Sequence, residues 1–203
     1  MIGIINYGSG NIIAIKNIFR VIGVESKIIN TQKDLYEVDK FILPGVGDFD
    51  ECISKFKSLT YFDELMNKIV NEKIHILGIC VGMHMLAEKS EEGELKGLGL
   101  IPGCVKKFNK KNFSYEAKTP HLGWNKISKI HNDTILDNVD EEKGFYFLHN
   151  YHYVSSNEYV LAESTHGYSF PSIVKNNNIY GVQFHPEKGH KNGMKLFENF
   201  NNL

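Results

Sequence analysis

The chain has 203 residues, 42% of them hydrophobic, and a formal net charge of −1. This length suits one α/β domain with a single core, and the near-neutral charge gives no electrostatic reason to expect nucleic acid or an anionic membrane as a partner. The three cysteines are odd in number, widely spaced and never in C-x-x-C spacing, which argues against a disulfide framework and a structural zinc site.

The first half of the chain predicts alternating strands and helices. Short β-branched runs indicate strands at residues 2–6, 25–29, 40–43 and 74–79. Pro44 and Gly45 are expected to end the third strand. Apolar residues at helical spacing indicate helices over residues 12–22 and 61–71. This alternation, with short connections, predicts an α/β fold built on a doubly wound, mostly parallel sheet flanked by helices.

The second half has a different pattern, in which Asn and Gly turns separate short apolar runs. These runs indicate strands at residues 145–148, 159–162, 171–175 and 179–184. The pattern is typical of antiparallel strands added to the sheet. Residues 192–200 predict a closing helix. Because no linker, low-complexity segment or internal repeat interrupts the chain, we expect one domain over residues 1–203.

The N-terminal residues 1–7 lack the basic region and the long apolar stretch of a signal peptide. No apolar run elsewhere approaches the length of a membrane span. We therefore expect a cytoplasmic protein whose thiols are reduced.

The strongest local signal is a cysteine at the end of the fourth predicted strand. Cys80 lies between Gly78 and Gly82, and a helical pattern follows. This is the cysteine counterpart of the Gly-x-Ser-x-Gly nucleophile elbow, in which glycines avoid clashes at a tight strand-to-helix turn. Backbone N–H groups at the start of the next helix favour a thiolate. An isolated cysteine is more often buried and structural, but this setting favours a nucleophile.

A nucleophilic cysteine needs a base, and the base needs an orienting group. His185 ends a predicted strand, Pro186 restricts the turn, and Glu187 follows where it could hold the imidazole tautomer. A lone histidine at a strand end is more often structural than catalytic. Its pairing with the cysteine elbow, on a separate strand, reverses that preference.

Closely spaced glycines also follow the third predicted strand, in the segment Pro44-Gly45-Val46-Gly47. Glycines let the backbone approach a ligand and point N–H groups at it. The functional interpretation is half of an oxyanion hole, completed by the amide of Val81. The structural alternative is an ordinary turn that ends a strand.

Two further segments give weaker signals. Residues 6–11 contain only part of a phosphate-loop pattern, without its full glycine spacing or a Lys-Ser/Thr pair, so nucleotide binding is not expected. His149 and His152 lie near Tyr151 and Tyr153, where few carboxylates alternate with them, and this predicts an aromatic cluster rather than a metal site. The sequence predicts no metal ion and no other cofactor.

The chain resembles the class I (triad) glutamine amidotransferases in three motifs and in their order. These are the Pro-Gly-Val-Gly segment, the Gly-Ile-Cys-Val-Gly-Met elbow and the His-Pro-Glu segment. More narrowly, the chain is similar to the glutaminase subunits of imidazole glycerol phosphate synthase, from histidine biosynthesis. The motifs of that subfamily lie at residues 7–11, 97–103, 120–125 and 181–188 and cover nearly the whole chain. The Pro-His-Leu-Gly-Trp-Asn segment at 120–125 is the most specific, since other glutamine amidotransferases do not typically carry it.

The resemblance implies a role for each member of a catalytic triad. Cys80 would attack the side-chain amide of glutamine, His185 would pass a proton to the leaving ammonia, and Glu187 would orient His185. The resulting γ-glutamyl thioester would then be hydrolysed to glutamate.

The resemblance also implies an oxyanion hole and a set of substrate contacts. The amides of Val46 or Gly47 and of Val81 would stabilise the tetrahedral oxyanion. The substrate-binding positions that match the family are Gly45, His84, Glu92, Asn150 and Tyr151.

Among the substrate-binding positions, Glu92 would bind the amino group of glutamine, and the backbone near Asn150 and Tyr151 would hold its carboxylate. Two of these positions depart from the family pattern, since His84 stands where Gln is usual and Asn150 replaces Ser or Thr. Gly189 also stands where Ser is usual. These departures leave the triad intact but change the expected contacts with glutamine.

The remaining matched positions, Trp124, Tyr146 and Lys188, would lie at a partner interface. The implied partner is a (β/α)8-barrel cyclase that forms a heterodimer with the glutaminase and receives ammonia through an internal channel. In this family glutaminase activity depends on that partner and its ligand. Because isolated members have low activity, we predict that the loop at residues 44–47 does not aim both oxyanion donors in the free subunit.

Two alternatives to this function follow from the departures. One is a paralogous amidotransferase that supplies ammonia for amidino-sugar biosynthesis. The other is a non-catalytic, partner-binding subunit on the same fold, against which the complete set of Cys80, His185 and Glu187 argues. A free-standing hydrolase or peptidase with the same elbow is disfavoured by the segment around Trp124.

Overall fold

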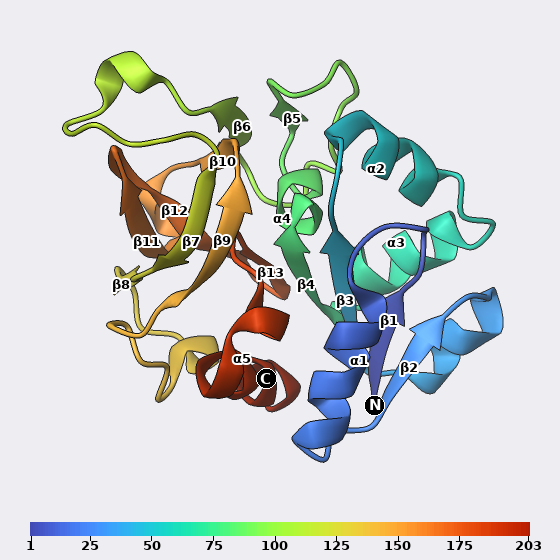
Figure 1. Cartoon of the computed structure of the whole chain (residues 1–203). Helices are drawn as coiled ribbons and strands as arrows, with labels where there is room; N and C mark the ends of the chain where they lie inside the picture. The colour runs from blue at the N-terminus through green and yellow to red at the C-terminus, as the bar shows by residue number, and fades with distance from the viewer.

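An eight-stranded sheet runs through the computed structural model, which describes residues 1–203 (Figure 1). The strand order is β2-β1-β3-β4-β13-β12-β11-β8. The first five of these strands are parallel, and the last three join them in antiparallel pairs. The strands are β1 (Ile2–Ile5), β2 (Ser26–Ile29), β3 (Lys40–Gly45), β4 (His75–Cys80), β8 (Ser128–Lys129), β11 (Val160–His166), β12 (Tyr168–Asn176) and β13 (Ile179–Val182).

Helices cover both faces of the parallel strands (Figure 1). The chain steps from β1 to β2 in one direction and from β3 to β4 in the other, so right-handed crossovers place α1 and the α2–α3 pair on opposite faces. Helix α5 packs beside α1, with the rings of Phe19 and Phe197 4.9 Å apart. The helices are α1 (Ile12–Val21), α2 (Phe49–Lys57), α3 (Phe62–Val70), α4 (Val81–Met85) and α5 (His190–Asn201). Short 3-10 helices lie at Gln32–Glu37, Lys110–Asn112, Thr134–Leu136, Asn157–Tyr159 and Pro186–Lys188.

Two smaller sheets lie outside the main one. A three-stranded sheet has the order β10-β6-β5, and β7 pairs with β9 in an antiparallel ribbon. Their strands are β5 (Lys89–Ser90), β6 (Cys104–Lys107), β7 (His121–Asn125), β9 (Phe145–His149) and β10 (Tyr151–Val154). Both chain termini lie toward the lower edge in Figure 1, away from the edge to which the carboxyl ends of the parallel strands point.

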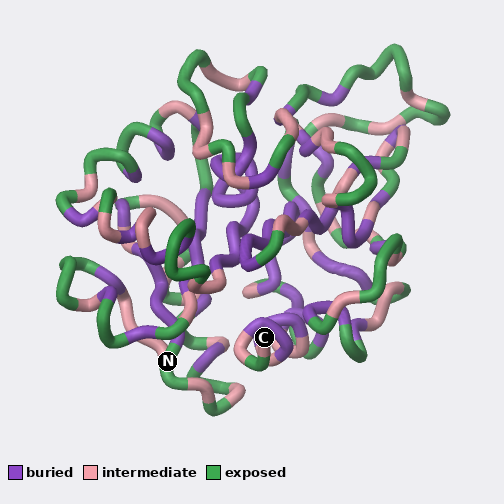
Figure 2. Tube along the Cα trace, turned by 180° about the vertical axis from the view of Figure 1, so that it is seen from behind, coloured by how far each residue is buried: buried purple, intermediate pink, exposed green.

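The core follows from the burial of the parallel strands on both faces. All four residues of β1 are buried, as are the last five of β4, because helices cover the sheet on each side. Figure 2 shows buried chain running through the centre of the molecule and exposed chain in the outer loops. None of the helices has the length and apolar composition needed to cross a bilayer.

Three buried asparagines tie loops to the core. Asn178, Asn192 and Asn199 each donate two hydrogen bonds from Nδ2 to backbone carbonyls, at 2.7–3.0 Å. An amide with two N–H groups can bind two backbone carbonyls at once and so link two points of the chain. The three acceptor pairs are Ile69 and Ile74, Asp140 and Gly144, and Ile135 and Asp137.

The structure confirms the predicted α/β fold class, with one correction to a strand boundary. We expected the third strand to end before Pro44, but β3 continues through Pro44 to Gly45. Pairing of β3 with β1 stops at Ile42, whereas pairing with β4 continues. A proline is tolerated there because the side without a partner strand needs no N–H donor. Helix α2 and the strands β5, β6, β7, β8 and β10 were not predicted.

The end of β3 touches the first turn of α4. Gly82 lies so close to β3 that a Cβ atom on it would be 2.0 Å from the carbonyl oxygen of Leu43. Only a glycine therefore allows α4 to start directly after β4. This contact also sets the segment that follows Leu43 beside Cys80, whose register partner is Gly45.

Replacing Gly82 by alanine is expected to destabilise the fold. The added Cβ would overlap the backbone of β3, and overpacking of this kind costs about 3 kcal/mol. For a chain of this size the thermal midpoint should fall by about 6–12 °C, measured by circular dichroism. Gly23→Ala is the control, since its Cβ would meet no atom within 4 Å and only its φ of +73° opposes the change. Equal midpoints for the two variants would contradict the close approach.

Candidate active site

The turn between β4 and α4 holds Cys80 in a left-handed conformation. Its φ is 56° and its ψ is −112°, which a non-glycine residue adopts only when the surrounding structure enforces it. The residue is buried at the carboxyl end of β4, where open α/β sheets bind their ligands. The predicted nucleophile elbow therefore has the expected backbone geometry.

His185 and Glu187 form a buried pair beside Cys80. Nδ1 of His185 lies 2.9 Å from Oε1 of Glu187, and both side chains are almost fully buried. Burial alone would lower the pKa of His185, but interactions with Cys80 and Glu187 outweigh it and raise that pKa to about 10. The ring is therefore cationic at neutral pH. A cationic ring next to a cysteine sulfur favours the nucleophilic thiolate.

A cavity of about 230 Å³ collects most of the predicted site residues. The cavity wall consists of Val46, Gly47, Cys80, Val81, His84, Glu92, Pro120, Leu148, His149, Asn150, Tyr151 and His185. Glu187 lies behind His185 and does not line the cavity.

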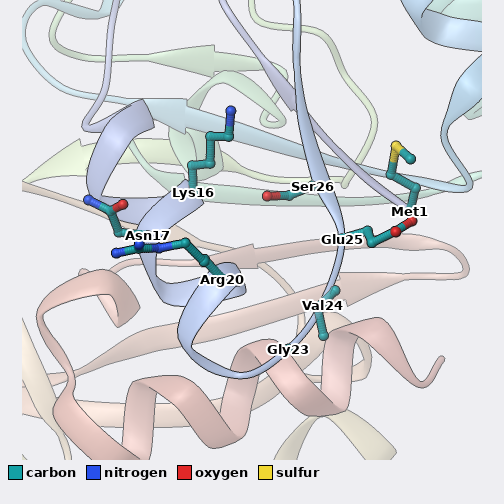
Figure 3. Close-up of a pocket in the computed structure, with 8 residues that line it drawn as sticks. All are labelled: Met1, Lys16, Asn17, Arg20, Gly23, Val24, Glu25 and Ser26. Atoms are coloured by element: carbon teal, nitrogen blue, oxygen red, sulfur yellow. The ribbon is translucent and has the colours of Figure 1, made fainter.

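A larger hollow, of about 520 Å³, lies at the N-terminal end of β2 and beside α1 (Figure 3). It contains no cysteine or histidine, so it offers no nucleophile and no base. Its lining residues are Met1, Lys16, Asn17, Arg20, Gly23, Val24, Glu25 and Ser26.

One predicted substrate-binding residue does not reach the cavity. Gly45 is buried and packs against the backbone of α4, where a Cβ on it would lie 2.4 Å from the nitrogen of Gly82. Gly45 is not among the residues that line the cavity, and its contact with substrate stays a prediction. Its place in the site is structural, because it lets the β3 end approach the elbow.

Glu92 lies in the cavity wall as a poorly solvated carboxyl group. Burial, and then the negative charge of Asp48, raise its pKa to about 7. Such a group gains most from a cationic ligand, which replaces the lost hydration with an ion pair.

His84 lines the cavity as a neutral ring. Its Nε2 lies 2.8 Å from Oε1 of Gln183, and its Nδ1 has no partner. Burial, as the largest cause, lowers the pKa of His84 to about 4. The ring therefore offers a ligand at most one free nitrogen, because Nε2 is taken by Gln183.

Two side chains from the loop after β1 hold the segment that follows β3. The hydroxyl of Tyr7 donates to the carbonyl of Pro44 at 2.6 Å. The hydroxyl of Ser9 donates to the carbonyl of Val46 at 2.7 Å and accepts from the Val46 N–H at 3.0 Å. The Val46 N–H is thus turned to Ser9, and the prediction that the loop does not aim both oxyanion donors stays a prediction.

Sequence reasoning missed the part that Tyr7 and Ser9 play. We considered residues 6–11 as a candidate phosphate loop and residues 7–11 as a subfamily motif, whereas in the structure Tyr7 and Ser9 hold the segment at 44–47. The signal was present in the subfamily motif at 7–11, but it carries no information about the distant segment it contacts. His149 and His152 do lie in an aromatic cluster around Phe108, as predicted, with ring centroids 5.3 and 4.7 Å from it.

Comparison with known proteins agrees with this geometry. The family model of class I glutamine amidotransferases matches residues 3–202. The chain belongs to this family. The amidotransferase is 42% identical to imidazole glycerol phosphate synthase subunit HisH of Leptospira borgpetersenii over 204 residues, covering all of both chains. It is 45% identical over 201 residues to subunit HisH 2 of Methanococcus maripaludis, covering 98% of each.

Solved structures share the fold of this amidotransferase. A putative GMP synthase protein from Thermoplasma acidophilum superimposes with a TM-score of 0.70 at 25% identity, covering 99% of this chain and 92% of that one. PurLQS from Thermotoga maritima gives a TM-score of 0.72 at 20% identity, covering 99% and 97%. At that identity the second match supports the fold alone.

The raised pKa of Glu92 predicts a pH-dependent affinity for glutamine. A neutral carboxyl cannot pair with the ammonium group of the substrate, and one unit below a pKa of about 7 only about a tenth of the groups are ionised. KM for glutamine should therefore be about tenfold higher at pH 6 than at pH 8, as measured by glutamate release. In Glu92→Gln, KM should be high and independent of pH. A pH dependence that survives in this variant would assign it to another group.

Removal of the Ser9 hydroxyl should release the Val46 N–H and raise the basal activity of the free amidotransferase. Both hydrogen bonds between Ser9 and Val46 are lost, so we expect glutamate release by isolated Ser9→Ala to increase about tenfold. Ser9→Thr keeps a hydroxyl and serves as the control, with activity close to that of the parent chain. Unchanged or lower activity in Ser9→Ala would mean that the clamp does not restrain the loop.

Proposed function

We propose that this amidotransferase is the glutaminase subunit of an imidazole glycerol phosphate synthase. The observation that carries the chemistry is the arrangement of His185, which lines one cavity with Cys80 and whose Nδ1 lies 2.9 Å from Oε1 of the buried Glu187. The full-length identity of 42–45% to subunits named HisH supports the specific synthase.

Glutamine binds with its side-chain amide at Cys80 and its amino-acid end at the opposite wall. Glu92 pairs with the ammonium group of glutamine, because a poorly hydrated carboxyl group gains from a cationic ligand. The backbone of Asn150 and Tyr151 holds the carboxylate. The cavity volume of about 230 Å³ and the presence of these residues in its wall support this orientation of one amino acid.

The reaction begins with attack of the Cys80 sulfur on the amide carbon of the substrate. A carbon–sulfur bond forms, and the carbonyl oxygen becomes an oxyanion. His185 then gives its proton to the nitrogen, the carbon–nitrogen bond breaks, and ammonia leaves a γ-glutamyl thioester. Glu187 keeps the ring in the orientation that this transfer needs.

Hydrolysis completes the cycle. The now neutral His185 takes a proton from water, whose oxygen attacks the thioester carbon and displaces the sulfur. The ring is again cationic and faces the thiolate, and glutamate leaves. The N–H groups of Val81 and of Val46 or Gly47 stabilise the oxyanion in both halves, and one such donor contributes about 2.7–4 kcal/mol.

The face around the cavity mouth suits a docked partner. The β7–β9 ribbon exposes apolar side chains on one side, with Leu122 61%, Trp124 51% and Leu148 42% exposed. Lys188 lies nearby, with its Nζ 4.7 Å from the ring centre of Tyr146. Contiguous exposed apolar groups with a charged rim mark protein interaction sites.

The partner on this face is the (β/α)8-barrel cyclase of the same synthase, in a heterodimer. Leu148 belongs both to the exposed face and to the cavity wall, so the docked barrel would stand over the site where ammonia is released. Ammonia passes through a channel to the cyclase, where the lyase step of the complete synthase takes place. Assembly and reaction occur in the cytoplasm.

The decisive measurement is glutamate release by the chain alone and with the cyclase of the same cell and its ligand. We expect the complex to be about 10²–10³-fold faster than the free glutaminase, the value of one oxyanion donor. Cys80→Ala should abolish release in both forms. Equal rates of glutamate release with and without the cyclase would argue for a free-standing glutaminase.

Rescue of a histidine auxotroph that lacks its own glutaminase identifies the ammonia acceptor. Growth of the rescued strain without histidine is expected for the parent gene and not for Cys80→Ala. Glutaminase activity without rescue would instead indicate a paralogous synthase, such as one that makes amidino sugars. Absence of glutaminase activity in every combination would indicate a non-catalytic subunit.

A further inference from the structure

A row of buried histidines connects the β7–β9 ribbon to the cavity wall. His121 and His149 are register partners on these strands and are only 4% and 6% exposed. Nδ1 of His121 lies 2.8 Å from Nε2 of His149, and Nδ1 of His149 lies 2.7 Å from the carbonyl oxygen of Tyr151. At the other end, Nδ2 of Asn125 lies 3.1 Å from Nε2 of His121.

The two ends of this row determine where its protons are. The carbonyl of Tyr151 only accepts, so Nδ1 of His149 carries a hydrogen and Nε2 of the neutral ring accepts from His121 Nδ1–H. Nε2 of His121 then accepts from the Asn125 amide. That amide is oriented by two backbone contacts, because its Nδ2 also donates to Thr165 and its Oδ1 accepts from Lys126. The hydrogen bonds of the row therefore all run in one direction, from Asn125 to His121, from His121 to His149, and from His149 to Tyr151.

Both rings are neutral in this arrangement. Burial, as the largest cause, lowers the pKa of His121 to about 3 and that of His149 well below its usual value. An added proton on either ring would set two N–H groups against each other and break the row. The aromatic packing also prevents the rings from turning, since His121 stacks between Phe147 and His166 at centroid distances of 4.8 and 4.3 Å.

The row ends on the part of the cavity where β9 passes into β10. His149, Asn150 and Tyr151 all line the cavity, and Asn150 is the corner between the two strands. The carbonyl of Tyr151 is held by His149, and the carbonyl of Asn150 accepts from the N–H of Phe108 at 3.1 Å. Both carbonyls of the corner are therefore bound to the protein, which sets the orientation of its peptide groups.

We propose that His121 and His149 are positioning residues that hold the Asn150–Tyr151 corner in the shape that receives the carboxylate of an amino-acid substrate. The inference rests on the proposed glutaminase function, because the corner matters only if an amino acid binds there. Neither histidine touches the reacting atoms. Each acts through the row of hydrogen bonds that ends at the Tyr151 carbonyl.

A test needs one probe that binds at the Asn150–Tyr151 corner and a second probe that does not. The glutamine analogue 6-diazo-5-oxo-L-norleucine carries the amino and carboxylate groups of the substrate and alkylates a reactive cysteine. Iodoacetamide alkylates the same sulfur but carries neither group. Labelling of Cys80 by each reagent is followed by mass spectrometry in the full-length chain.

His149→Phe keeps an aromatic ring but removes both hydrogen bonds of the side chain. We expect its second-order labelling by the diazo analogue to fall about tenfold, while labelling by iodoacetamide changes less than twofold. His149→Asn, whose Nδ2 can replace the Nδ1 donor to Tyr151, should recover most of the lost rate. His121→Phe keeps the ring stack and the Tyr151 contact but removes the donor to His149, so a smaller loss of about threefold is expected. His121→Phe is also the test variant if His149→Phe does not fold.

The chain offers a matched control in His152. It is 5% exposed, belongs to the same cluster around Phe108, and also makes two hydrogen bonds, to the carbonyl of Tyr153 and the hydroxyl of Tyr168. It does not line the cavity. His152→Phe should lose similar stability yet label with both reagents at the parent rates.

The outcomes separate a positioning role from a purely structural one. Equal loss of diazo labelling in His149→Phe and His152→Phe, or equal loss with both reagents, would mean that the row only stabilises the fold. Failure of the diazo analogue to label the parent chain, while iodoacetamide labels Cys80, would overturn the proposed glutamine site and this inference with it. Normal diazo labelling of both His149→Phe and His121→Phe would overturn the inference alone.

Discussion

The contact between the end of β3 and the first turn of α4 is the constraint on which the rest of the site depends. Gly82 lies against the carbonyl of Leu43, and the chain can enter α4 only if Cys80 takes a left-handed conformation. The backbone strain at Cys80 is offset by the pairing of β4 with two parallel neighbours. As a result, the cysteine residue and the segment after β3 are adjacent in space, although α2, α3 and β4 separate them along the chain.

Burial has opposite consequences for histidines that lie within one small region. His185 is cationic because two potential anions, Cys80 and Glu187, face it. His84, His121 and His149 are neutral because burial lowers their pKa values, and their neighbours, which are amides, carbonyls and other histidines, supply no opposing negative charge. The same residue type thus supplies a proton donor at one wall of the cavity and fixed, uncharged hydrogen-bonding groups elsewhere. The difference lies in the neighbours and not in the degree of burial.

Sequence reasoning succeeded where the signal is local. The glycines around Cys80, the helical spacing in residues 12–22 and the His-Pro-Glu segment each report a short-range geometry that the structure contains. It failed where the relevant partner is far along the chain. Ser9 acts on Val46, 37 residues away, and His121 acts on His149, 28 residues away. The close packing of Gly45 against Gly82 was not foreseen for the same reason, since the two residues are brought together only by the fold.

The buried asparagines have a consequence for the chemical lifetime of the chain. Asn192 is followed by Gly193, and this pair deamidates readily in flexible peptides because the glycine nitrogen can attack the side-chain amide. In the fold, both amide hydrogens of Asn192 are bound to carbonyls, and the Gly193 N–H donates to the carbonyl of Gly189, the residue that caps the start of α5. The attack therefore requires unfolding of this region. An aspartate at this position would face the two carbonyl oxygens of Asp140 and Gly144, so deamidation would leave a chain whose fold is less stable.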